Sequence, residues 1–181
     1  MPTAAADAGP LIHLAQINKL PLLKQLFSDI YITQKVKKET IDNGLALGYK
    51  DAEAISKALT EGWLKTKHLP KKHAQTAKKL AQGENISQAD AETLLLATTE
   101  KAELLTDDKI LAHLAKMHGL KTWNTWTLLL EALSRDYVKL NDIEQAINEL
   151  GKKKFRLNPA QAQEILDAAK LIHKQKQTSI N

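Results

Sequence analysis

The chain has 181 residues, of which 43% are hydrophobic and 26% are charged, proportions that exclude a largely disordered protein and favour one domain with a small addition. Cysteine is absent, which excludes disulfides, thiol catalysis and thiolate metal sites. The net charge of +5 suits a polyanionic partner.

Helical periodicity and short apolar runs alternate along most of the chain. The predicted elements are, in order, a weak strand at 4–6, a helix at 11–27, a strand at 30–32, helices at 35–47 and 51–61, a strand at 63–69, a basic helix at 71–81, a helix after the capping box at 87–90, a strand at 103–106, a helix at 108–117, a strand at 122–124 and a helix at 125–133. This alternation predicts an α/β fold with a mainly parallel central sheet.

The pattern becomes wholly helical after residue 139. Helices are predicted at 142–150 and after the Asn158–Pro159 pair, and residues 175–181 are expected to be frayed. We therefore expect a sheet domain at 1–138 and a C-terminal helical extension at 139–181, packed on that domain or on a partner.

Acidic residues stand close to the ends of several predicted elements. Asp7 follows the first strand, and Asp107 and Asp108 follow the strand at 103–106. Asp90 lies in the first turn of the helix before that strand, and Glu39 lies on the helix after the strand at 30–32. Ligands of open α/β sheets bind beyond the carboxyl ends of the strands, so these side chains could converge there. Converging carboxylates repel one another and are the ligands that Mg²⁺ prefers.

Each of these acids also has a purely structural interpretation. Asp7 could open a turn, and Glu39 could pair with Lys35 on a solvated helix face. Asp90 could be the capping-box acid, and Asp108 could be the N-cap of a helix. For any single residue the structural interpretation is the favoured one.

Short motifs spread over nearly the whole chain occur in one characteristic order. They are DAGPLI at 7–12, LPLLKQLF at 20–27, IYI at 30–32, VKKE at 36–39, DAETLLLA at 90–97, LTDD at 105–108 and FRLNP at 155–159. In this order they resemble PIN-domain proteins, in particular a subfamily related to the VapC-type toxin ribonucleases. The resemblance implies a three-layer α/β/α fold with an acidic pocket that binds Mg²⁺ or Mn²⁺.

The same resemblance assigns roles to individual residues. The catalytic and metal-binding positions would be Asp7, Glu39, Asp90 and Asp108, because the second aspartate is the ligand in the family's Thr-x-Asp pattern. The supporting or substitute positions would be Glu92, Asp107, Thr106 and Thr125. The alanine-rich first strand, and the asparagine at position 124 where the family often has a small residue, depart from the pattern.

The function implied by the resemblance is a divalent-metal-dependent endoribonuclease, the toxin half of a toxin–antitoxin pair. Its partners would be RNA, a small antitoxin protein and a second copy of the chain. Two alternatives stay open: a nuclease of the same fold that acts on DNA or structured RNA, and a non-catalytic module that binds nucleic acid or protein.

The basic residues offer candidate contacts to nucleic acid. Residues 65–79 contain six lysines and no acid. Four of these lysines are the expected phosphate contacts: Lys71, Lys72, Lys78 and Lys79. The alternative for each of them is an ordinary solvated lysine. The chain has no run of eighteen apolar residues and no signal-peptide pattern, so we expect a cytoplasmic protein that is not embedded in a membrane.

Overall fold

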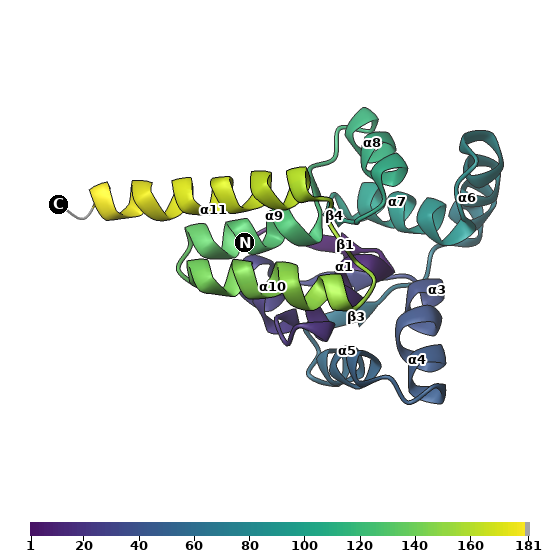
Figure 1. The fold of residues 1–181 in the computed structure, drawn as a ribbon. Coiled ribbons are helices and arrows are strands. Elements are labelled where there is room, and N and C mark those ends of the chain that lie inside the picture. The colour runs from purple at the N-terminus through teal and green to yellow at the C-terminus, as the bar shows by residue number, and fades with distance from the viewer. Residues whose placement is uncertain (180–181) are drawn as a thin grey trace. The chain divides into compact units, whose positions relative to one another are not determined.

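The computed structural model describes residues 1–179 and divides the chain into two compact units (Figure 1). Unit 1 is Met1–Asn124 and contains the sheet, and unit 2 is Thr125–Asn181. The described part of unit 2 consists of the helices α9 (Thr125–Ser134), α10 (Leu140–Lys152) and α11 (Pro159–Ser179). This division falls one helix earlier than the boundary at residue 138 that the sequence suggests. The boundary of the functional domain at residue 138 stays a prediction.

The sheet of unit 1 has five strands, all parallel, in the order β3-β2-β1-β4-β5. The strands are β1 (Ala4–Ala6), β2 (Ile30–Ile32), β3 (Leu64–Thr66), β4 (Glu103–Leu105) and β5 (Thr122–Trp123). The three alanines of β1 are fully buried at the centre, where ladder bonds to β2 and β4 override the poor strand propensity of alanine. The predicted parallel sheet is confirmed.

Helices flank this sheet, as predicted. In unit 1 they are α1 (Ala8–Gln16), α2 (Leu23–Leu26), α3 (Gln34–Lys37), α4 (Asn43–Ala46), α5 (Lys50–Thr60), α6 (Lys71–Glu84), α7 (Gln88–Glu100) and α8 (Lys109–Met117), with a 3₁₀ turn η1 (Leu20–Leu22) and a π turn η2 (Lys38–Asp42). The helix predicted at 11–27 is broken, because Asn18 adopts the left-handed conformation (φ 56°) and Pro21 then opens η1.

The core on one face of the sheet lies between the strands and the pair α7 and α8. Ala5 and Leu104 of the sheet pack there with Leu94 of α7 and Leu111 of α8. Residues that precede and follow Ala5 point to the opposite face, where α5 contacts β3 and α1. The sheet domain is thus a three-layer α/β/α arrangement whose strands all end at the same edge.

Unit 2 is held together by apolar packing and by one lysine. Trp126 stacks on Phe155 with the ring centroids 5.8 Å apart. Lys176 donates to the carbonyl of Leu133 at 3.0 Å and pairs with Asp136. The prediction that residues 175–181 are frayed is therefore wrong up to Ser179, where α11 is still helical, and residues 180–181 lie outside the described part. In the described chain we find no helix whose length and apolar character would let it cross a membrane.

Candidate active site

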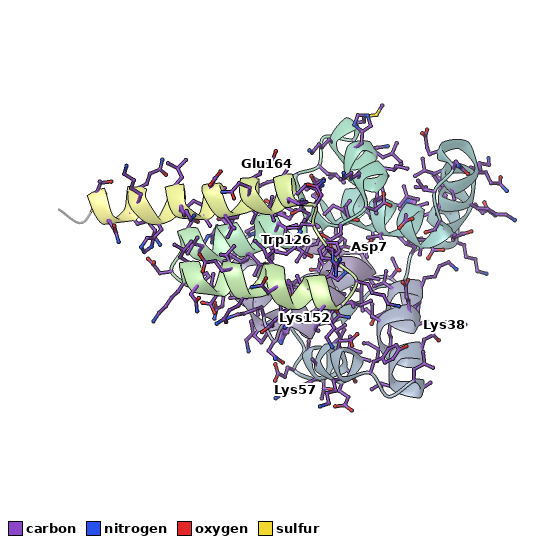
Figure 2. The ribbon with its side chains drawn as sticks, viewed as in Figure 1. Asp7, Lys38, Lys57, Trp126, Lys152 and Glu164 are labelled. Atoms are coloured by element: carbon purple, nitrogen blue, oxygen red, sulfur yellow. The ribbon has the colours of Figure 1, made fainter. Side chains whose placement is uncertain are left out.

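Asp7, labelled in Figure 2, directly follows the central strand β1 and precedes α1. Its backbone N–H donates to the carbonyl of Leu105 at 2.9 Å, which places it beside the end of β4. As the N-cap of α1, its Oδ1 accepts the N–H of Ala8 at 2.7 Å, and its Oδ2 accepts the hydroxyl of Thr106 at 3.2 Å. Asp7 therefore caps a helix and does not open a turn.

The electrostatic surroundings of Asp7 are unfavourable for a charged carboxylate. Burial, together with the nearby carboxylates of Asp90 and Glu39, raises the pKa of Asp7 from 3.8 to about 6, although the Ala8 N–H and the Thr106 hydroxyl oppose the rise. Two of the other predicted acids, Asp90 and Glu39, therefore lie close enough to act on Asp7. A bound cation would relieve this repulsion.

Asp90 serves as the acid of a capping box at the start of α7. Its Oδ2 accepts the hydroxyl of Ser87 at 2.7 Å and the Ser87 N–H at 3.2 Å, while its own N–H donates to the Ser87 hydroxyl at 3.0 Å. The structural interpretation of Asp90 is thus confirmed. The capping box uses Oδ2 of Asp90. Within residues 1–179 the other oxygen, Oδ1, accepts no hydrogen bond.

Glu39 lies in the π turn η2, between α3 and α4, and its side chain is exposed. The structural interpretation that it pairs with Lys35 is wrong, because Lys35 lies instead 3.6 Å from Oε1 of Glu92. The wider π turn changes the angular offset between positions 35 and 39, so they do not stack as they would on a regular α-helix. Single π turns of this kind occur often at functional sites.

Asp107 and Asp108 point in different directions from the turn after β4. Asp108 is the N-cap of α8, with Oδ1 accepting the N–H of Leu111 at 2.8 Å, as its structural interpretation predicts. Its backbone N–H donates to the hydroxyl of Thr106 at 3.1 Å, so Thr106 links Asp108 to Asp7. Asp107 turns toward α1, where its Oδ2 lies 2.7 Å from Nδ1 of His13.

His13 is the residue of this region that sequence reasoning missed. It sits in the apolar segment AGPLIHLAQ of α1, where a single histidine carries no motif. The other supporting candidates are spread out: Glu92 accepts the amide of Gln88 at 3.2 Å, and Thr125 is buried at the start of α9 in unit 2.

The lysines proposed for nucleic acid form a stripe along α6. Lys71, Lys72, Lys78 and Lys79 repeat at positions seven apart, which places them on one helix face, and all four side chains are exposed. The opposite face, with Ala77 fully buried, packs on α7 (Figure 1). In the described chain these four lysines take part in no ion pair, so their charge is available to a polyanion.

The donor chemistry of the acidic edge suits a hard cation. Within residues 1–179 no group of three or more acidic or histidine side chains is close enough to enclose a metal ion by itself. Mg²⁺ does not need such an enclosure, because it keeps several waters and is commonly bound by one or two carboxylates. The all-oxygen donor set and the raised pKa of Asp7 therefore fit a largely hydrated divalent ion.

One family model identifies the family of the chain, and one solved structure supports the fold. The family model described as "DUF3368: PIN domain" matches residues 3–171. PAE2754 from Pyrobaculum aerophilum is 20% identical, with 71% of this chain and 95% of that chain covered and a TM-score of 0.53. A domain of a functionally unknown protein from Methanocaldococcus jannaschii DSM 2661 is 22% identical. The match covers 68% of this chain and 91% of that chain, with a TM-score of 0.44. No curated protein matches the sequence.

Proposed function

Since the chain belongs to the PIN-domain family, which has a nuclease-type fold, we propose that it is a divalent-metal-dependent endoribonuclease. The observation that carries the proposal is the acidic environment of Asp7. Its pKa is raised by burial and by two further carboxylates at the edge of the sheet where α/β proteins bind ligands. Such an arrangement is costly for a protein that binds no cation there.

Four carboxylates would share the ion. One or two of them would bind it directly and the others would hold its bound waters. Asp90 and Glu39 would act from beside Asp7, and Asp108 would act from the turn that Thr106 ties to Asp7. When bound, Mg²⁺ or Mn²⁺ would activate water for attack on a phosphodiester and neutralise charge that develops on the phosphate. The Thr106 hydroxyl keeps its proton directed at Oδ2 of Asp7, which fixes the orientation of that carboxylate.

The lysine stripe on α6 would bind the phosphates of the substrate. Four exposed lysines on one helix face offer charge without aromatic side chains between them, which favours contact with the backbone over stacking on bases. A preference for RNA rests on the motif order that resembles the VapC-type ribonucleases. The same motif order supports a toxin role, a small antitoxin and a dimer, and a short antitoxin-like reading frame beside the gene would support that role further.

A non-catalytic binding module is the second candidate. It is favoured by the capping bonds of Asp90 and Asp108, because capping alone would explain an acid at either position. It leaves unexplained why Glu39 and Asp90 approach a buried Asp7.

Cleavage assays on matched oligonucleotides separate these possibilities. We expect wild type to cut single-stranded RNA in Mn²⁺, to be inactive in EDTA, and to lose activity in the Asp7→Asn variant. Faster cleavage of DNA of the same sequence would favour a nuclease for DNA. No cleavage of either polymer, with oligonucleotide binding retained, would favour the binding module.

A further inference from the structure

A histidine lies against the acidic edge of the sheet in unit 1. Nδ1 of His13 is 2.7 Å from Oδ2 of Asp107, and the two side chains are only 18% and 10% exposed. A carboxylate can only accept, so the imidazole N–H donates. His13 belongs to α1, whereas Asp107 lies in the turn after β4, so the bond joins the two segments that begin with Asp7 and end with Asp108.

The Asp107 carboxylate is also confined by the first turn of α1. A Cβ on Gly9 would lie 3.2 Å from Oδ2 of Asp107 and 3.4 Å from its Cβ. The aspartate therefore packs over a residue two positions after Asp7, in a space that glycine leaves open. Confined by the imidazole on one side and by Gly9 on another, Asp107 has little freedom to turn.

Fixing Asp107 restrains the residues on either side of it. Thr106 donates its hydroxyl to Asp7 and accepts the N–H of Asp108. Asp107 lies between Thr106 and Asp108 in the chain, so holding its carboxylate against α1 restrains the turn whose backbone carries both. The bond between His13 and Asp107 therefore ties to α1 the turn that carries Asp108 and that reaches Asp7 through Thr106.

From this geometry we propose that His13 is a positioning residue of the metal centre, which acts through Asp107 to present Asp7 and Asp108 to one cation. The inference rests on the proposed function, since it requires a divalent ion at this edge. His13 itself would not contact the ion. Hydrogen bonds that orient metal ligands in this way typically contribute about 10- to 100-fold to metal affinity.

A purely structural pair would have a different signature. If the bond only held α1 to the β4–α8 turn, its loss would lower the thermal midpoint in EDTA and leave the affinity for metal unchanged. Metal affinity is therefore the readout that distinguishes positioning from simple stabilisation.

The test is a Mn²⁺ titration of the thermal midpoint for wild type and three single variants. His13→Leu fills the space without a donor, His13→Asn keeps an N–H near the place of Nδ1, and Asp107→Asn removes the acceptor charge. We expect half-saturating Mn²⁺ to rise about 10- to 100-fold in His13→Leu and less in His13→Asn. Adding His13→Leu to Asp107→Asn should cause no further rise, because His13 acts through Asp107.

Unchanged half-saturation in His13→Leu, with a lower midpoint in EDTA, would overturn the proposal and leave a structural pair. If His13→Leu does not fold, unchanged half-saturation in both His13→Asn and Asp107→Asn has the same meaning. A wild type that does not respond to Mn²⁺ would overturn the metal centre itself, and this inference with it, so the two failures are distinguishable.

Discussion

Asp7 is the residue on which the proposed chemistry depends, and it is also a source of instability. Its oxygens satisfy the N-terminus of α1 and the hydroxyl of Thr106, so its position is fixed by the fold. Burial and the carboxylates of Asp90 and Glu39 make its ionised form unfavourable at that position. A fixed carboxylate that resists ionisation is preorganised for a cation.

The raised pKa of Asp7 predicts how stability changes with pH. The folded protein holds the proton of Asp7 up to about pH 6, whereas the unfolded chain releases it near 3.8. The protonated Asp7 carboxyl therefore makes its full contribution to the free energy of unfolding below pH 4. This contribution, about 3 kcal/mol at most, is lost as the pH rises through 6.

Asp7→Asn should remove this dependence, because asparagine caps helices as well as aspartate and carries no charge. In EDTA, urea unfolding should find the variant more stable than wild type above pH 6 and similar near pH 4. The gain should shrink when Mn²⁺ is added, because only wild type can use the ion fully. A variant less stable than wild type at pH 7.5 in EDTA would contradict this account of Asp7.

The sequence could predict part of this site. Asp7, Asp107 and Asp108 were placed at strand ends by the local pattern, and the capping box of Ser87 and Asp90 is a local signal that the structure confirms. The direction in which Asp107 points could not be predicted. It depends on the contact with His13, 94 residues away in the chain, and no local pattern encodes such a contact.

At the level of elements, the helix that carries Glu39 depends on close packing between α4 and α5. A Cβ on Gly44 would approach the Cβ of Ala52 to 2.5 Å, so the two helices come closer there than any other residue would allow. This contact fixes the far end of the helix that contains the π turn η2. Glycine is thus a packing residue at this position.

Gly44→Ala should therefore destabilise the protein by about 1–3 kcal/mol, the usual effect of overpacking. Gly83→Ala is the matched control, because position 83 is also helical but has nothing within 4 Å of an added Cβ. The control should be neutral or stabilising by up to about 1 kcal/mol, since alanine favours helix over glycine. Equal effects of the two substitutions in urea melts would show that the α4–α5 contact is unimportant.

The lysine stripe on α6 gives a second prediction for an element. Charge reversal of Lys71, Lys72, Lys78 and Lys79 together should weaken RNA binding for all sequences and reduce its dependence on salt. A control with the same net charge reverses four exposed lysines elsewhere, Lys50, Lys57, Lys170 and Lys174. Fluorescence anisotropy at low and high salt measures both properties. If the two variants bind equally well at low salt, α6 does not face the RNA.

Most element types followed from the sequence, and the wrong predictions concern single-turn irregularities. The break after α1 arises from the left-handed Asn18, a conformation that asparagine tolerates but does not require. The π turn that displaces Glu39 from Lys35 depends on how α3 and α4 pack on the rest of unit 1, and no periodicity announces it. Element boundaries and single-turn irregularities were therefore beyond local patterns.

For the whole molecule, the alternation of strands and helices predicted the architecture correctly, because an all-parallel sheet leaves few ways to connect its strands. The assembly state is a separate matter and rests on the resemblance. We predict a dimer, and light scattering at about tens of micromolar should give twice the monomer mass, since weak interfaces associate in this range. A mass of one chain at that concentration would contradict the dimer.

Thermal midpoints in EDTA and in millimolar Mn²⁺ show whether the carboxylates at the sheet edge hold a divalent cation. The comparison uses wild type and the single variants Asp7→Asn, Glu39→Gln, Asp90→Asn and Asp108→Asn. We predict that Mn²⁺ raises the midpoint of wild type and that this rise shrinks in all four variants, because an amide is a poorer ligand and adds no negative charge. A wild type whose midpoint is the same in EDTA and in Mn²⁺, or four variants whose midpoints rise as much as that of wild type, would contradict the claim.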